Sequence, residues 1–110
     1  MTTVTFGKHN GQIVSVECQG HTGWAESGQD IVCAALSAMV QSCALGLLQV
    51  VGIKAKYHTD DKTGYLKLVL PELDPNTRHD ADVLLITLQK SVEDLSQDYH
   101  QYVKSEVKEL

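Results

Sequence analysis

The sequence predicts a single α+β domain over residues 1–110, with the element order ββαββα. Three observations support this class. Residues 2–19 alternate between apolar and polar side chains, residues 31–53 carry no formal charge, and residues 77–103 repeat apolar positions with a helical period. We expect a four-stranded, mostly antiparallel sheet with a buried central helix and a second covering helix.

The N-terminal segment is expected to form a hairpin, because Asn10-Gly11 is a strong turn signal between two strand-like runs. A register that pairs Phe6 with Val16 and Val4 with Cys18 collects the apolar side chains on one face. This register predicts a three-residue loop with Gly11 in a left-handed conformation. It also directs Cys18 into the core.

The charge-free run predicts a helix from Ile31 to about Val51, ended by Gly52. The run is long enough to cross a bilayer. Polar side chains interrupt it, however, and Asp30 and Lys54 bound it closely. We therefore expect a core helix and no membrane partner.

A second hairpin is expected from residues 54–59 and 65–70, which flank a polar turn ending at Gly64. From about Thr77 to Val103, an apolar stripe with a 3.6-residue period predicts the covering helix. The stripe consists of Ala81, Leu84, Leu85, Leu88, Val92, Leu95, Tyr99 and Tyr102.

Composition restricts the partners. The net charge is −5, from 9 basic and 14 acidic residues, which argues against direct nucleic-acid binding and suits a cationic protein partner. The three cysteines, Cys18, Cys33 and Cys43, follow no secretory signal. We expect a cytoplasmic protein with free thiols.

Cys33 stands at the head of the central helix. Asp30 is a good N-cap whose carboxylate can accept from the amide of Cys33, although Ser27 offers a competing cap one turn earlier. A thiol in the first turn lies near the positive end of the helix dipole, which favours the thiolate form. Ser37 and Gln41 continue a polar stripe along the helix, which indicates a cleft or a polar partner.

His21 precedes this thiol on a glycine-rich loop. An imidazole within reach of a cysteine can take the thiol proton and later protonate a leaving amine. By spacing alone, however, a lone histidine and cysteine are more often structural or incidental than catalytic, and that alternative stays open for both residues. No second close pair of ligands accompanies His21 and Cys33, so we expect no metal and no cofactor.

Glycines at 20, 23 and 28 give the loop the freedom of a substrate gate. Trp24, the single tryptophan, is either an anchor that holds this loop shut or part of a pocket for an aromatic substrate side chain, and we favour the pocket. The expected substrate-binding residues are Gly20, Gly23, Trp24, Gly28, Asp30 and Ser37.

The segment GHTGWAESGQDIVCAALS, residues 20–37, resembles the signature of the ribosomal-processing cysteine protease family, Prp. The matching residues are Gly20, His21, Gly28, Asp30, Ile31, Val32, Cys33, Ala34, Ala35 and Ser37. Thr22 stands where alanine is usual in that signature, and Leu36 where valine is common. The resemblance extends over essentially the whole chain in length and element order.

The resemblance implies a bacterial endopeptidase with Cys33 as nucleophile and His21 as general base. Members of the family remove a short N-terminal extension from large-subunit ribosomal protein number twenty-seven, cut after an aromatic residue, and are homodimers. An alternative is a non-catalytic ribosome-assembly binding protein that holds the ribosomal protein without cutting it. A thiol redox sensor is a weaker alternative, because Cys43 is too far along the same helix to bond to Cys33. Cys43 is expected to serve packing.

Overall fold

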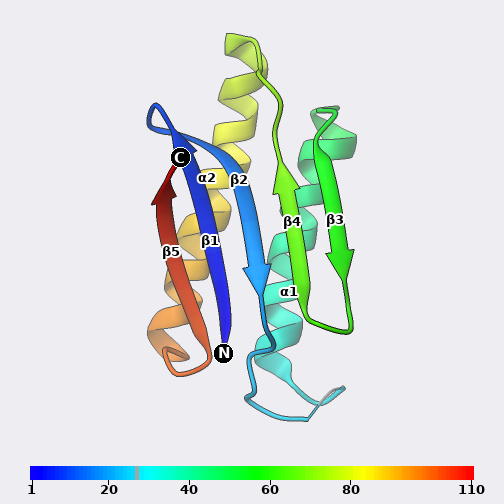
Figure 1. Cartoon of the computed structure of the whole chain (residues 1–110), viewed down its shortest axis with the longest axis vertical. Coiled ribbons are helices and arrows are strands. Elements are labelled where there is room, and N and C mark those ends of the chain that lie inside the picture. Colours follow the sequence, from blue (N-terminus) through cyan, green and yellow to red (C-terminus); the bar gives the residue numbers. More distant parts are fainter. Residues whose placement is uncertain (27) are drawn as a thin grey trace.

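The computed structural model describes residues 1–26 and 28–110, and in this part of the chain five strands accompany two long helices (Figure 1). The elements are β1 (Thr2–His9), β2 (Gln12–Gln19), α1 (Ile31–Leu45), a π-helical extension η1 (Gly46–Val50), β3 (Lys56–Asp60), β4 (Tyr65–Val69), α2 (Pro75–Asp98) and β5 (Val103–Glu109). The predicted α+β class is confirmed, with one strand more than expected.

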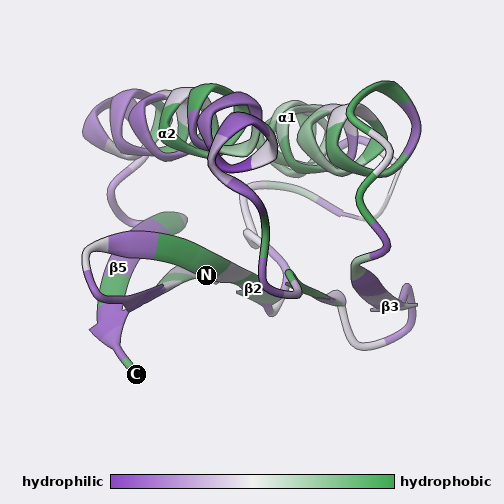
Figure 2. Ribbon diagram, turned by 90° about the horizontal axis from the view of Figure 1, so that it is seen from above, coloured by the Kyte–Doolittle hydropathy of each residue, from purple (hydrophilic) through white to green (hydrophobic). Residues whose placement is uncertain are grey.

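The strands form one sheet in the order β3-β4-β2-β1-β5. All neighbouring strands are antiparallel except β1 and β5, which are parallel. Figure 2 shows that α1 and α2 lie side by side over one face of the sheet, so the fold has two layers. In the part of the chain that the structure describes, the other face of the sheet carries no helix (Figure 2).

The prediction of a helix through Val103 is wrong, because α2 ends at Asp98 and Val103 begins β5. Tyr99 leaves the helical conformation (φ −126°, ψ 44°). From Val103 onward, apolar or small side chains alternate with charged ones, which is the period of a strand. Thr2 pairs with Val103, so β5 covers the edge of β1 that a four-stranded sheet would leave open. His100 lies in the turn before β5.

The predicted register of β1 and β2 is confirmed. Phe6 pairs with Val16, and Val4 pairs with Cys18. All four side chains are buried in the cluster between the sheet and the helices. The apolar face that the register predicted is therefore the core face, and Cys18 belongs to it.

The loop of this hairpin has two residues instead of the predicted three. His9 pairs with Gln12 across it, and Asn10 and Gly11 have φ values of 53° and 78°, as in a type I′ turn. The register shifts within the strands instead, at Gly7–Lys8. A bulge thus absorbs the extra residue that we had assigned to the loop.

The charge-free segment forms α1 and η1. Ile31–Val50 is long and apolar enough to cross a membrane by length and composition alone, with a mean hydropathy of 2.0. In the fold, one side of it packs into the same core as the sheet and α2, as predicted. Gly52 has a φ of 82° and follows the end of the helical segment, also as predicted.

The β3–β4 hairpin begins and ends within two residues of the predicted strands. Its turn lies at the same end of the molecule as the loop between β2 and α1 (Figure 1). The two segments are in close contact, since a Cβ atom added to Gly64 would lie only 2.8 Å from the carbonyl oxygen of Gly20. This contact forms one wall of the candidate site.

Candidate active site

Asp30 is the N-cap of α1 and determines where the helix begins. Its backbone is extended (φ −84°, ψ 96°), and its Oδ1 accepts a hydrogen bond from the amide of Cys33 at 2.8 Å, as predicted. Cys33 therefore lies in the first turn, with its side chain partly exposed. The competing cap at Ser27 lies outside the described residues.

The second carboxylate oxygen of Asp30 binds the preceding loop. Oδ2 accepts from the Thr22 hydroxyl at 2.5 Å and from the amides of Trp24 and Ala25 at 3.1 and 3.4 Å. Desolvation raises the pKa of Asp30, but these hydrogen bonds and the one from Cys33 outweigh it and keep the pKa below its ordinary value. Asp30 thus joins the loop to the helix as a carboxylate.

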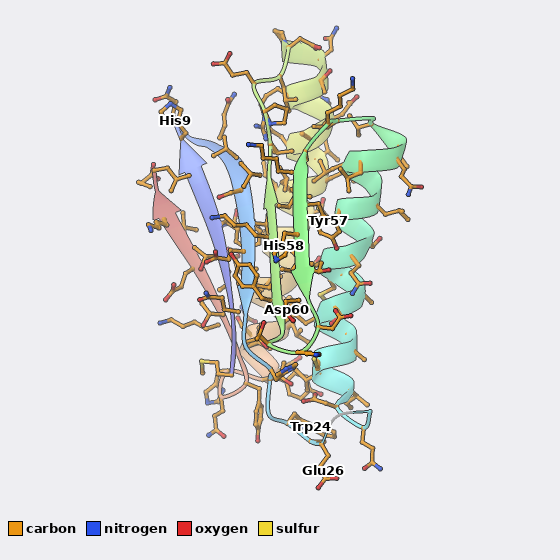
Figure 3. All side chains as sticks on the ribbon, turned by 45° about the vertical axis from the view of Figure 1, so that its right-hand side comes forward. His9, Trp24, Glu26, Tyr57, His58 and Asp60 are labelled. Carbon is orange, nitrogen blue, oxygen red and sulfur yellow. The ribbon has the colours of Figure 1, made fainter. Side chains whose placement is uncertain are left out.

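His21 and Cys33 line one pocket of about 200 Å³ between α1 and the β3–β4 hairpin. Ser37 and Gln41 line the same pocket, so the polar stripe of α1 faces a cavity. Figure 3 shows Asp60, at the end of β3, at the same end of the molecule as the loop before α1. The apolar wall of the pocket is formed by Cys18, Leu36, Val40 and Leu66.

The imidazole of His21 is exposed and rests against the β3–β4 turn. Its Nε2 lies 3.4 Å from the carbonyl oxygen of Lys62. A Cβ atom on Gly64 would lie 3.0 Å from Cε1 of His21, so only a glycine lets the turn approach the ring this closely. The described residues include no hydrogen bond between His21 and Cys33, and catalytic pairs are often this open before substrate binds.

Most of the predicted substrate-binding residues lie around this pocket. Gly20 and Ser37 line the pocket itself. A wider groove opens beside it, and its lining includes Gly23, Gly28 and Asp30. Trp24 is 40% exposed and belongs to neither lining. Its role in substrate binding stays a prediction.

The β3–β4 turn is the part of the site that sequence analysis missed. Asp60, Asp61 and Gly64 line the pocket, and Lys62 lines the groove. The turn is 41 positions from His21 along the chain. Its sequence is an ordinary hairpin signal, so only the sheet order brings it to the imidazole.

The two other thiols are buried and differ from Cys33 in this respect. Burial, together with the charge of Glu17, raises the pKa of Cys18 to about 12. Burial raises the pKa of Cys43 to about 11, and its Sγ lies 3.6 Å from the carbonyl oxygen of Leu84. Both remain neutral thiols at neutral pH, and a neutral thiol is a poor nucleophile.

The described residues contain no group of three or more histidine, cysteine or acidic side chains that could hold a metal ion. They do bring together a partly exposed thiol in the first turn of a helix, an imidazole on the adjoining loop, and a pocket that both line. This arrangement defines a candidate cysteine hydrolase.

Comparison with known proteins identifies the family within the class of cysteine hydrolases. The model of the cysteine protease Prp family matches residues 1–104. Over 92 residues, the chain is 34% identical to the ribosomal processing cysteine protease Prp of Bacillus subtilis (strain 168), which covers 83% of this chain and 82% of that protein. The chain belongs to the Prp family of cysteine proteases.

Solved structures agree in fold. The ribosomal processing protease Prp of Staphylococcus aureus, in complex with a covalently linked product peptide, superimposes with a TM-score of 0.89 at 23% identity, covering 98% of this chain and 100% of that chain. The same protease with a substrate peptide gives a TM-score of 0.83 at 24% identity, with 98% and 100% coverage. The five-stranded sheet and its two helices are therefore the fold of this family.

Proposed function

We propose that this chain is an endopeptidase that removes a short N-terminal extension from large-subunit ribosomal protein number twenty-seven during ribosome assembly. Cys33 is the nucleophile and His21 the general base. The observation that carries this assignment is that both side chains line the pocket, and the groove beside it, at the start of α1. Membership of a cysteine protease family supplies the reaction class.

In this reaction, the Cys33 thiol transfers its proton to His21, and Sγ attacks the carbonyl carbon of the scissile peptide bond. The tetrahedral intermediate collapses as the imidazolium protonates the leaving amine, which leaves a thioester on Cys33. Water then attacks the thioester with His21 as base and releases the carboxylate product. Only the complete cycle of acylation and hydrolysis returns the thiol and the imidazole to their starting states.

The hydrogen bond between His21 and the β3–β4 turn favours one tautomer. A carbonyl oxygen can only accept, so Nε2 carries the proton when it bonds to Lys62. The other ring nitrogen, Nδ1, is then unprotonated and able to accept the proton of Cys33. A main-chain carbonyl thus has the orienting role that a carboxylate or amide side chain has in many triads.

The start of α1 offers donors for the oxyanion. The amide of Cys33 is already bonded to Asp30. The amides of Ile31 and Val32 belong to the first turn of α1 and lie at the positive end of the helix dipole. We assign the stabilisation of the tetrahedral oxyanion to these first-turn amides.

The substrate assignment rests on chemistry and on relatives. The Bacillus subtilis relative is a ribosomal processing protease, and the Staphylococcus aureus structures hold a substrate peptide or a product peptide. The net charge of −5 attracts a basic ribosomal protein, and Asp60 and Asp61 bring acidic groups to the pocket. The apolar wall of the pocket suits an aromatic side chain before the cleaved bond.

The direct test is to incubate the purified chain with the ribosomal protein of the same host and measure the masses of the products. We expect two fragments whose masses correspond to one cut after an aromatic residue near the N-terminus. Cys33→Ala and His21→Ala should abolish or strongly reduce cleavage, whereas Cys43→Ala serves as a matched control and should retain it. A substrate that stays intact with the parent chain would contradict the proposal.

The alternative of a non-catalytic binding protein is not retained, because the chain belongs to a family of cysteine proteases. The proposed site of action is the cytoplasm, where thiols stay reduced and ribosomal proteins are assembled. The acidic net charge favours contact with the protein substrate over direct contact with ribosomal RNA.

We also propose that the chain acts as a homodimer. Ile31, Leu45 and Val50 are 59%, 53% and 82% exposed on α1 and η1, a segment without formal charge. Burial of these side chains against a second copy would remove apolar surface from water. Sedimentation equilibrium should give a dimer for the parent, a monomer for Leu45→Glu, and a dimer for Val83→Glu on α2. A monomeric parent would contradict the proposal.

A further inference from the structure

Thr22 is the anchor of the loop that carries His21. It is 1% exposed, whereas the other described residues from 21 to 30 are exposed or only partly buried. A buried threonine needs a partner for its hydroxyl group. Among residues 1–26 and 28–110, its hydroxyl donates to Oδ2 of Asp30, at 2.5 Å.

Asp30 connects Thr22 to the first turn of α1. Its Oδ1 accepts from the amide of Cys33 at 2.8 Å, while its Oδ2 accepts from Thr22. A carboxylate is planar and rigid, so the two hydrogen bonds fix the Thr22 hydroxyl and the Cys33 amide relative to one another. Thr22 directly follows His21 in the chain. The carboxylate of Asp30 therefore holds the backbone next to the proposed base at a fixed position relative to the backbone of the proposed nucleophile.

We propose that Thr22 is a positioning residue, whose hydroxyl holds the His21 loop against the start of α1 in the geometry required for transfer of the Cys33 proton. The inference rests on the proposed roles of His21 and Cys33. It assigns a function to a side chain that lines neither the pocket nor the groove beside it. It also distinguishes this chain from the signature that it resembles, in which alanine is usual at this position.

A purely structural role for Thr22 predicts different effects of substitution from a positioning role. Thr22 also fills a buried site, so its replacement by a smaller residue removes packing as well as the hydroxyl group. Thr22→Val keeps the shape and removes only the hydrogen bond. Thr22→Ser keeps the hydroxyl and removes a methyl group. The pair therefore separates positioning from packing.

The loss of the hydroxyl also changes the titration of Asp30. The hydrogen bond from Thr22 is one of those that lower the pKa of Asp30, so the pKa rises in Thr22→Val. Protonation of Asp30 then begins at a higher pH and weakens its bonds to the Cys33 amide and the loop. Rates that depend on the alignment of His21 and Cys33 should fall off earlier as the pH is lowered.

The test measures the rate of Cys33 alkylation by iodoacetamide, and kcat/KM for cleavage, as functions of pH in the parent, Thr22→Val and Thr22→Ser. In Thr22→Val we expect both rates to fall about three- to tenfold at neutral pH, the loss of one hydrogen bond to a charged group. KM should be unchanged, and the acid limb of each pH–rate profile should move to higher pH. In Thr22→Ser, both rates and the position of the acid limb should return to those of the parent.

Unchanged rates and an unchanged acid limb in Thr22→Val would overturn the inference, as would an equal defect in Thr22→Ser. Thermal unfolding monitors the fold of each variant. If Thr22→Val does not fold, Thr22→Ala takes its place against Thr22→Ser in the same comparison. Alkylation needs no substrate, so it tests Thr22 even if the ribosomal protein is not cleaved, and the two proposals fail separately.

Discussion

Nε2 of His21 lies 3.4 Å from the main-chain carbonyl oxygen of Lys62, on the turn between β3 and β4. The imidazole is therefore oriented by a hairpin that is distant in sequence. Gly64 makes this contact possible, because its backbone has a φ of 66° and its Cα faces the ring of His21 without a side chain. Changes in this turn should affect catalysis through the histidine.

Gly64→Ala should lower kcat/KM at least tenfold. The new Cβ would lie 2.8 Å from the carbonyl oxygen of Gly20 and 3.0 Å from Cε1 of His21, so the ring must move. Gly11→Ala is the matched control, because Gly11 has a φ of 78° and no atom near its added Cβ. Both variants carry the strain of a positive φ, about 1–2 kcal/mol, but Gly11→Ala should keep full activity. Equal activity of the two variants would contradict the role of the turn.

Iodoacetamide at neutral pH should label the folded chain at one site, Cys33. Cys33 is partly exposed, whereas Cys18 and Cys43 are buried, and the pKa values of these two are raised to about 12 and about 11. Mass spectrometry should detect a single adduct that disappears in Cys33→Ala. Full labelling in guanidinium should reveal the other two. Rapid labelling of Cys18 in the folded chain would contradict its assignment to the core.

Cys18 should make stability depend on pH in the alkaline range. Its pKa rises from 9.0 to about 12 on folding, so the unfolded chain loses this proton first. The protonated thiol therefore contributes to the free energy of unfolding. This contribution is fully present below pH 9 and is lost as the pH rises toward 12. Cys18→Ala lacks this contribution but also lacks some packing, which costs about 1–2 kcal/mol.

Urea denaturation of the parent and of Cys18→Ala, at a series of pH values above 9, measures this effect. The stability advantage of the parent should shrink steadily as the pH rises. Other titrating groups are common to both proteins and cancel in the difference. A difference that stays constant with pH would mean that burial does not perturb this thiol.

Trp24 fluorescence should report substrate binding. Its indole is 40% exposed in the free chain, and it lies on the loop whose amides bond to Asp30. If the loop orders over the substrate, a peptide with the extension sequence should shift the emission to shorter wavelength on binding to Cys33→Ala, which cannot turn it over. An unchanged spectrum at saturation would remove Trp24 from the binding surface.

Much of the fold was predictable because local patterns determine it. The alternation in β1 and β2 specified the pairing of Phe6 with Val16, and the apolar period of α2 specified which face is buried. The N-cap signal of Asp30 indicated the start of α1, although Ser27 offered a competing cap. Capping and periodicity depend on nearby residues, so sequence analysis captures them well.

The errors arose where distant segments decide the structure. β5 has only two valines among charged residues, and its pairing with β1 at the edge of the sheet stabilises it. Within the hairpin, Asn10-Gly11 favours a two-residue loop, and the core register is restored by a bulge that no local signal marked. α2 begins at Pro75, two residues before the predicted start at Thr77. The sequence does carry a signal for this start, since Asp74 is a good N-cap and proline is favoured in the first turn of a helix.

The site likewise contains residues that the sequence predicts and residues that only the fold brings together. His21, Asp30 and Cys33 lie within one motif, so their proximity was predictable from sequence. Lys62 and Gly64 reach the imidazole only because β4 pairs with β2 and β3 pairs with β4. The hydroxyl of Thr22 could have been noticed as a polar group beside the proposed base, but its burial was visible only in the fold.

The central claim is that Cys33 attacks the substrate carbonyl. Acid quenching during turnover, followed by intact-protein mass measurement, tests it most directly with a variant that lacks Cys18 and Cys43 and with Cys33→Ala. The first should carry an added mass equal to the acyl part of the extension peptide, held as a thioester, and the second should carry none and cleave nothing. An adduct on Cys33→Ala, or undiminished cleavage by it, would contradict the account.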